Sequence, residues 1–252
     1  MNREATGLAG ARHKHYETLG STNAEALVLA RAGERGPLWI TAAAQSAGRG
    51  RRGSAWVSKP GNLYATLLLT DPAEPAQAPQ LSFAAALALH DAVANCAPAL
   101  GPSLKVKWPN DLLLGGRKIA GILIEGESVP VLTVVIGIGV NCAHHPDDTP
   151  FPATDLAAAG ALVTPEHVFA ALSEAMERRL VQWARGEGFA AIRSDWLKRA
   201  AGLGQEVRVR LPEREFSGLF HGLDDAGRLL VQQGGALTPV TAGEVFGFGG
   251  VS

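Results

Sequence analysis

The spacing of hydrophobic residues changes several times along the chain. Helical spacing predicts helices over 24–32, 78–97, 165–185 and 189–200. Residues Thr22-Asn23-Ala24-Glu25 have the pattern of a capping box, which places the start of the first helix here. Continuous or alternating apolar runs predict strands over 38–42, 62–70, 104–108, 111–114, 118–125 and 131–140.

The order of these elements predicts an α+β fold. Gly115-Gly116-Arg117 is a hairpin signal between two of the strands, and four strands follow one another closely. Strands in series, framed by helices instead of alternating with them, favour a mainly antiparallel mixed sheet and disfavour a Rossmann fold. The β-branched run at 131–140 suits either a central or an edge strand, so both a monomer and a homodimer remain open.

The pattern changes after Gly202-Leu203-Gly204. Short strands are predicted at 207–211, 215–221, 229–232 and 244–246, separated by turns such as Gly234-Gly235. We therefore predict two domains: a larger one over 1–203 and a small β-barrel over 204–252.

Composition and charge exclude several classes of protein. The 252 residues carry 23 basic and 24 acidic side chains, and the net charge of -1 gives no overall field that would attract nucleic acid or an acidic membrane. No apolar run reaches the length of a membrane span, and the N-terminus lacks the apolar segment of a secretory signal. The two cysteines lack metal-ligand spacing, so we expect no protein-held metal, and a reducing cytoplasm fits best.

Three arginines and three glycines are concentrated in the segment 48–53. Glycine lets the backbone approach a ligand, and guanidinium groups bind phosphate or carboxylate oxygens in pairs, so the segment suits a loop that closes over a nucleotide. By itself it is equally typical of a solvated basic turn.

Three further motifs carry polar groups beside turns or glycines. Asn110 and Asp111 follow Lys107-Trp108-Pro109, and Lys118 starts the next strand, although an Asx-type turn with a flanking lysine explains the same pattern. The segment from Gly137 to Asn141 has a Gly-x-Gly spacing that close strand packing also explains. Ser21-Thr22-Asn23 starts a helix, where free N–H groups also suit a ligand carboxylate.

Taken together in this order, the motifs resemble those of the biotin protein ligases. The family pattern is a Ser-Thr-Asn helix start, a Gln before Gly-Arg-Gly-Arg-x-Gly, then Lys-Trp-Pro-Asn-Asp, a Lys in Arg-Lys-x-Ala-Gly-x-Leu-x-Glu, and Gly-x-Gly-x-Asn. All five are present between Ser21 and Asn141, and the C-terminal strands resemble the family's SH3-like domain.

The resemblance implies ATP-dependent activation of biotin to biotinyl-5'-AMP, followed by transfer of biotin to a lysine of a biotin carboxyl carrier protein, with Mg²⁺ at the phosphates. It assigns catalysis to Lys118, Arg51 and Asp111, the last orienting the incoming lysine or accepting its proton. It assigns biotin binding to Ser21, Thr22, Asn23, Gln45, Arg49, Gly50, Arg51, Lys118, Gly121 and Gly137. It assigns the nucleotide to Arg49, Arg51, Trp56, Asn110, Lys118 and Asn141.

Departures from the family pattern and rival functions accompany this hypothesis. Ser54 stands where some members have a further basic residue. Only 20 residues precede Ser21, so we expect no DNA-binding helix-turn-helix of the kind that the repressor members have. A lipoate or octanoate protein ligase is the closest rival. A non-catalytic biotin-binding adaptor is another, although it would not require Lys118 or the arginine loop. Nucleic-acid binding is weaker still, because no aromatic residues interleave with the basic ones.

Overall fold

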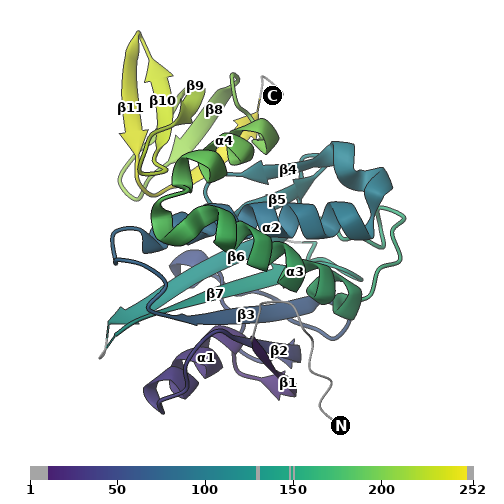
Figure 1. The fold of residues 1–252 in the computed structure, drawn as a ribbon. Helices are drawn as coiled ribbons and strands as arrows, with labels where there is room; N and C mark the ends of the chain where they lie inside the picture. The colour runs from purple at the N-terminus through teal and green to yellow at the C-terminus, as the bar shows by residue number, and fades with distance from the viewer. Residues whose placement is uncertain (1–10, 129–130, 148, 150, 249–252) are drawn as a thin grey trace.

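The protein is built on two β-sheets with a layer of helices beside the larger one (Figure 1). The computed structural model describes residues 11–128, 131–147, 149 and 151–248. The ends of both predicted domain ranges, 1–10 and 249–252, lie outside the described residues. No helix in the described part is long and apolar enough to cross a membrane.

The larger sheet has seven strands in the order β1-β2-β3-β7-β6-β5-β4. They are β1 (Arg12–Leu19), β2 (Leu38–Gln45), β3 (Leu63–Thr70), β4 (Leu104–Lys107), β5 (Asp111–Leu114), β6 (Arg117–Ser128) and β7 (Leu132–Val140). Every neighbouring pair is antiparallel except β1 and β2. The predicted mixed, mainly antiparallel sheet is confirmed, and β7 is a central strand.

The first strand was missing from the prediction. Its sequence is rich in charged residues and histidine, and it lies at the sheet edge with few buried positions, so it lacks the alternation that marks a strand. It pairs in parallel with β2, and α1 (Thr22–Arg31) makes the crossover that a parallel pair requires. One helix therefore does alternate with strands.

Helices cover the two faces of this sheet unequally. On one face, α2 (Leu81–Cys96) and α3 (Pro165–Trp183) pack in the main core against side chains such as Trp39 and Ile136, with α4 (Phe189–Arg199) beside them. On the other face, α1 packs over Leu38, Leu68 and Val135. The predicted helices are all present, although the one expected to end at Arg185 gives way at Ala184 to a short 3-10 turn.

The predicted capping box at the start of α1 is wrong. The helix begins at Thr22 with Ser21 as its N-cap, and no side chain caps it. Thr22 Oγ1 donates instead to Gln45 Oε1 at 3.1 Å, and Glu25 accepts from the Tyr16 hydroxyl. Tertiary contacts have taken the polar groups that a capping box would use.

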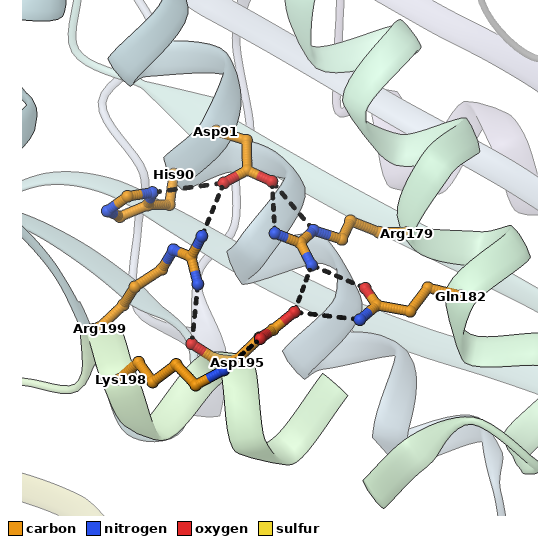
Figure 2. Close-up of polar contacts among 7 residues, drawn as sticks. All are labelled: His90, Asp91, Arg179, Gln182, Asp195, Lys198 and Arg199. Carbon is orange, nitrogen blue, oxygen red and sulfur yellow. Dashed lines mark hydrogen bonds and ion pairs between the residues drawn. The ribbon is translucent and has the colours of Figure 1, made fainter. Parts of the chain in front are cut away.

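A polar network fixes α2, α3 and α4 relative to one another (Figure 2). The Arg179 guanidinium of α3 contacts Asp91 of α2 at 2.6 Å and Asp195 of α4 at 3.0 Å, and Gln182 also bonds Asp195. Arg199 reaches Asp91 from the other side. Arg179 is only 12% exposed and the two aspartates are about a quarter exposed, so the centre of the network is partly shielded from water.

The C-terminal sheet has five antiparallel strands in the order β11-β10-β9-β8-β12. They are β8 (Glu206–Arg210), β9 (Glu215–Leu223), β10 (Leu229–Gln233), β11 (Ala236–Val240) and β12 (Glu244–Phe248). The pattern did not predict β11, because it contains Pro239; proline is tolerated there since β11 is an edge strand.

Candidate active site

Strand alternation divides the residues of β7 between the two faces of the larger sheet. Ile136 and Ile138 lie in the core below α2 and α3, whereas Val135 packs with α1 on the other face. Gly137 and Gly139 therefore face the α1 side. In register, Gly137 is flanked by Thr66 and Leu123, and Gly139 by Tyr64 and Gly121. The three glycines have no side chains to fill the space over the middle of the sheet.

A cavity of about 530 Å³ lies over these glycines. Five cationic and two anionic side chains are among its lining residues, which gives it a local positive charge that the whole-chain value of -1 conceals. All fourteen residues predicted for the site line it: Ser21, Thr22, Asn23, Gln45, Arg49, Gly50, Arg51, Trp56, Asn110, Asp111, Lys118, Gly121, Gly137 and Asn141.

The start of α1 forms one wall of the cavity through a chain of buried hydrogen bonds. The Thr22 N–H donates to Gln45 Oε1 at 2.8 Å, and Gln45 Nε2 donates to Ser58 Oγ at 2.9 Å. Thr66 Oγ1 donates to Asn23 Oδ1 at 2.7 Å. These bonds hold the side chains of Thr22, Gln45 and Asn23 in fixed orientations beside the cavity.

Asn23 also ties the helix to the arginine loop, residues 48–53. Its Nδ2 donates to Glu125 Oε2 at 2.9 Å, and the same oxygen accepts from Arg49 Nη2 at 3.0 Å. A carboxylate shared by an amide and a guanidinium is a charge-assisted arrangement that fixes both donors.

The arginine loop folds as a compact turn. The Gly50 N–H donates to the Ser54 carbonyl at 2.7 Å, and Arg52 has a φ of 54°. Arg51 Nη1 donates to Asn110 Oδ1 at 3.4 Å and to the Gly243 carbonyl at 3.3 Å, so the loop contacts both sheets. Burial and the neighbouring Arg52 lower the pKa of the Arg51 guanidinium.

Trp56 covers the glycines of the sheet. A Cβ at Gly139 would lie 2.6 Å from the indole, and one at Gly121 would lie 3.1 Å from it. Lys118 Nζ is 5.4 Å from the centre of the ring, within cation–π range, and Trp56 Nε1 is a buried donor that has no partner among the described residues. Gly139, the second glycine of the Gly-x-Gly motif, is therefore explained by the close approach of an aromatic ring.

Asp111 lies between two lysines. Its Oδ1 is 2.6 Å from Lys118 Nζ, and its Oδ2 is 3.0 Å from Lys107 Nζ. Burial raises the pKa of this carboxyl, but the two lysines outweigh that effect and the pKa is lowered overall. Both oxygens are occupied and the group stays ionised, which favours an orienting role for Asp111 and disfavours a role as proton acceptor.

Asn141 is held by its surroundings. Its Nδ2 donates to the Thr154 carbonyl at 3.1 Å, and its carbonyl accepts from the Leu156 N–H. Lys118 pairs with Ala153 in the same stretch. Asn141 thus joins the end of β7 to the segment that borders Lys118.

Several residues of the site had no predicted role. Thr66 lies within the otherwise apolar strand β3, and a buried polar residue in such a strand is the signal that could have identified it. Glu125 ends the Arg-Lys-x-Ala-Gly-x-Leu-x-Glu motif, but the motif assigned it no role. The cavity is also lined by Lys107 and Phe151 and, from the C-terminal sheet, by Arg210, Glu244 and Phe246.

Comparison with known proteins identifies the family. Residues 21–141 match the biotin/lipoate A/B protein ligase family, and residues 202–246 match the biotin protein ligase C-terminal domain. A biotin–[acetyl-CoA-carboxylase] ligase of Paracoccus denitrificans is 45% identical over 91% of this chain and 98% of that one. The chain belongs to the biotin protein ligase family.

Other members of the biotin protein ligase family resemble the chain over most of its length. The bifunctional ligase/repressor BirA of Bacillus subtilis is 32% identical over 95% of this chain and 75% of the relative. The biotin protein ligase of Aquifex aeolicus in complex with biotin and ATP has a TM-score of 0.79 at 23% identity, covering 93% of this chain and 97% of that one. This likeness confirms the predicted α+β fold, and the C-terminal sheet is consistent with the family's SH3-like domain.

Proposed function

We propose that the protein activates biotin with ATP and transfers it to a lysine of a biotin carboxyl carrier protein. This acceptor would be a subunit or domain of a biotin-dependent carboxylase. The observation that carries this proposal is the gathering of all five family motifs around one positively charged cavity. The name of the relative from Paracoccus denitrificans, a biotin–[acetyl-CoA-carboxylase] ligase, supports a carboxylase carrier as the acceptor.

In the first step, a biotin carboxylate oxygen bonds to the α-phosphorus of ATP, and the bond to pyrophosphate breaks. Two anions must come together, so a positioned cation lowers the barrier. Lys118 suits this role because it lines the cavity while one carboxylate oxygen holds its ammonium. Arg51, which is half-buried between the two sheets, is placed to bind the α-phosphate and retain the adenylate.

The biotin head group would lie between the start of α1 and the glycines of β6 and β7. Ser21, Thr22 and Asn23 together with Gln45 supply polar groups, and Gly121 and Gly137 line the pocket and leave room there for Trp56 and Asn23. Arg49 and Gly50 would line the reactive end of biotin. A few oriented polar groups inside a mainly apolar pocket match a ureido ring joined to an apolar tail.

The adenylate would extend toward Trp56, Asn110 and Asn141. In the second step, the carrier lysine attacks the acyl carbon of the mixed anhydride, AMP leaves, and the amine loses a proton. We assign Asp111 the role of holding Lys118, since its pKa is lowered and both of its oxygens are in use.

Mg²⁺ would fit this site only when it is bound to the phosphates of ATP. Among the described residues, no group of three or more His, Cys, Asp or Glu side chains could hold a metal ion. Mg²⁺ is bound readily by substrate phosphates with few protein ligands, so we propose that it enters as the MgATP complex.

The test is biotin-dependent exchange between ATP and pyrophosphate. We expect exchange with biotin and not with lipoate or octanoate, and a loss of at least 100-fold in Lys118→Ala. Lys105→Ala is the matched control, because Lys105 is exposed on β4 and outside the cavity. Exchange with lipoate or octanoate instead would favour the rival ligase, and binding of biotin without exchange would favour an adaptor.

Further parts of the proposal concern the domains of the protein, its partners, its oligomeric state and its compartment. We propose a catalytic domain ending near Leu203 and a C-terminal domain after it, no binding to DNA or membranes, and a monomer or homodimer in the cytoplasm. Cys96 and Cys142 are free thiols, which supports a reducing compartment.

A further inference from the structure

Lys107 is a buried cation for which neither motif spacing nor the proposed chemistry supplied a role. It lies at the end of β4, directly before the Trp-Pro-Asn-Asp turn, and its side chain is only 7% exposed. Burying an ammonium group is costly unless partners compensate it, so its contacts indicate what it does.

The partners of Lys107 come from three parts of the chain. Its Nζ is 3.0 Å from Asp111 Oδ2 and donates to the Val245 carbonyl of β12 at 3.4 Å. It also lies 4.1 Å from the centre of the Phe151 ring and 6.0 Å from that of Phe246. A carbonyl, two ring faces and a carboxylate all favour a positive charge at this point.

Asp111 therefore shares its charge between two cations in different surroundings. Lys107 is enclosed, whereas the Lys118 side chain is 26% exposed and borders the cavity. The three groups carry two positive charges and one negative, a net charge of +1. Without Lys107, Lys118 and Asp111 would form a neutral pair, and this cluster would add no net positive charge to the part of the cavity beside Lys118.

We infer that Lys107 is a positioning residue that neutralises Asp111 from behind, so that Asp111 can hold Lys118 in place without cancelling its charge. This inference rests on the proposed function, since it assigns the net charge to the meeting of carboxylate and phosphate. Because β12 supplies the Val245 carbonyl and the Phe246 ring, the C-terminal sheet stabilises this charge.

The net charge of the three groups gives a test that distinguishes an electrostatic role of Lys107 from a purely structural one. Lys107→Met lowers the net charge of the three groups to zero, Asp111→Asn raises it to +2, and the double variant returns it to +1. An asparagine at 111 keeps an oxygen that can accept from Lys118. We expect Lys107→Met to exchange about 100-fold more slowly than the wild type. The double variant should exchange about tenfold faster than Lys107→Met, or more.

The control is Lys105→Met, which removes an exposed lysine from the same strand and should exchange at the wild-type rate. A Lys107→Met rate equal to wild type, or a double variant as slow as Lys107→Met, would overturn the inference. Simple disruption of the fold would make the double variant the slowest, so recovery also demonstrates folding.

The affinity for inorganic pyrophosphate, measured by calorimetry, gives a readout that does not depend on activity. The expected order from tightest to weakest is Asp111→Asn, then wild type and the double variant together, then Lys107→Met. If the wild type showed no exchange with biotin, the proposed function would fail while this order would still support the charge role of Lys107. Equal affinities in all four proteins would overturn it.

Discussion

The side chain of Asn23 occupies the space directly over Gly137, because a Cβ at residue 137 would lie 2.3 Å from Asn23 Oδ1. Asn23 cannot move away easily, since Thr66 and Glu125 hold its amide on both ends. The absence of a side chain at 137 thus determines where a polar group of the proposed biotin pocket stands.

Gly137→Ala should therefore weaken biotin binding. We expect the dissociation constant to rise at least tenfold, about 1.4 kcal/mol, because the methyl group displaces Asn23 from its bonded position. Calorimetric titration with biotin measures this. Gly222→Ala in β9 is the matched control, since a Cβ there meets nothing within 4 Å, and an equal loss in both variants would contradict the explanation.

Arg179→Met should destabilise the helical layer by about 2 kcal/mol. The substitution keeps much of the side-chain volume but leaves Asp91 and Asp195 without their shared cation in a partly shielded setting. Urea unfolding measures the change. Arg185→Met removes an exposed ion pair with Asp71 near the end of the same helix and should change stability by less than about 0.5 kcal/mol.

The same network predicts a loss of stability in acid. The pKa of Asp195 is held below its usual value by hydrogen bonds from Gln182, Lys198 and Arg179. Burial raises the pKa of Asp91, but hydrogen bonds from His90 and Arg179 together with the charges of Arg179 and Arg199 outweigh burial, so the pKa is lowered overall.

Carboxyl groups with lowered folded pKa values stabilise the fold fully above the unfolded pKa of about 3.9 and lose that contribution as pH falls through the folded value. Stability should therefore be maintained from pH 7 to about pH 5 and decline below pH 4. Urea unfolding at pH 6, 5, 4 and 3 tests this, and the decline should be shallower in Arg179→Met. An equal slope in both proteins would mean that other carboxyl groups cause it.

Cys142 should be unreactive in the folded protein. Burial raises the pKa of its thiol to about 12, so almost no thiolate forms at pH 8, and the side chain is 1% exposed. In a Cys96→Ser variant, mass spectrometry should find no iodoacetamide adduct in the folded protein and one adduct after unfolding in urea. Rapid modification of the folded variant would show that β7 opens at its end.

Local patterns predicted most of the fold, and the exceptions have identifiable causes. β6 and β7 have long apolar runs that burial on a sheet requires, so their positions could be read from the chain. β1 and β11 are edge strands, and a half-exposed edge tolerates charged residues or Pro239 that conceal a strand. The capping-box pattern at Thr22 and Glu25 failed because contacts from distant strands used the same side chains.

The sequence by itself determined which motifs gather in one place, since the fourteen residues that the family resemblance assigned to the site all line one cavity. Only the tertiary structure decided what surrounds them. Thr66, which no motif contains, became part of the site through its hydrogen bond to Asn23. The contacts of Glu125 and Lys107 are likewise hydrogen bonds and ion pairs that no local spacing encodes. Val245 and Phe246 lie more than 130 positions from Lys107, and they reach its ammonium because the C-terminal sheet packs against the end of the cavity.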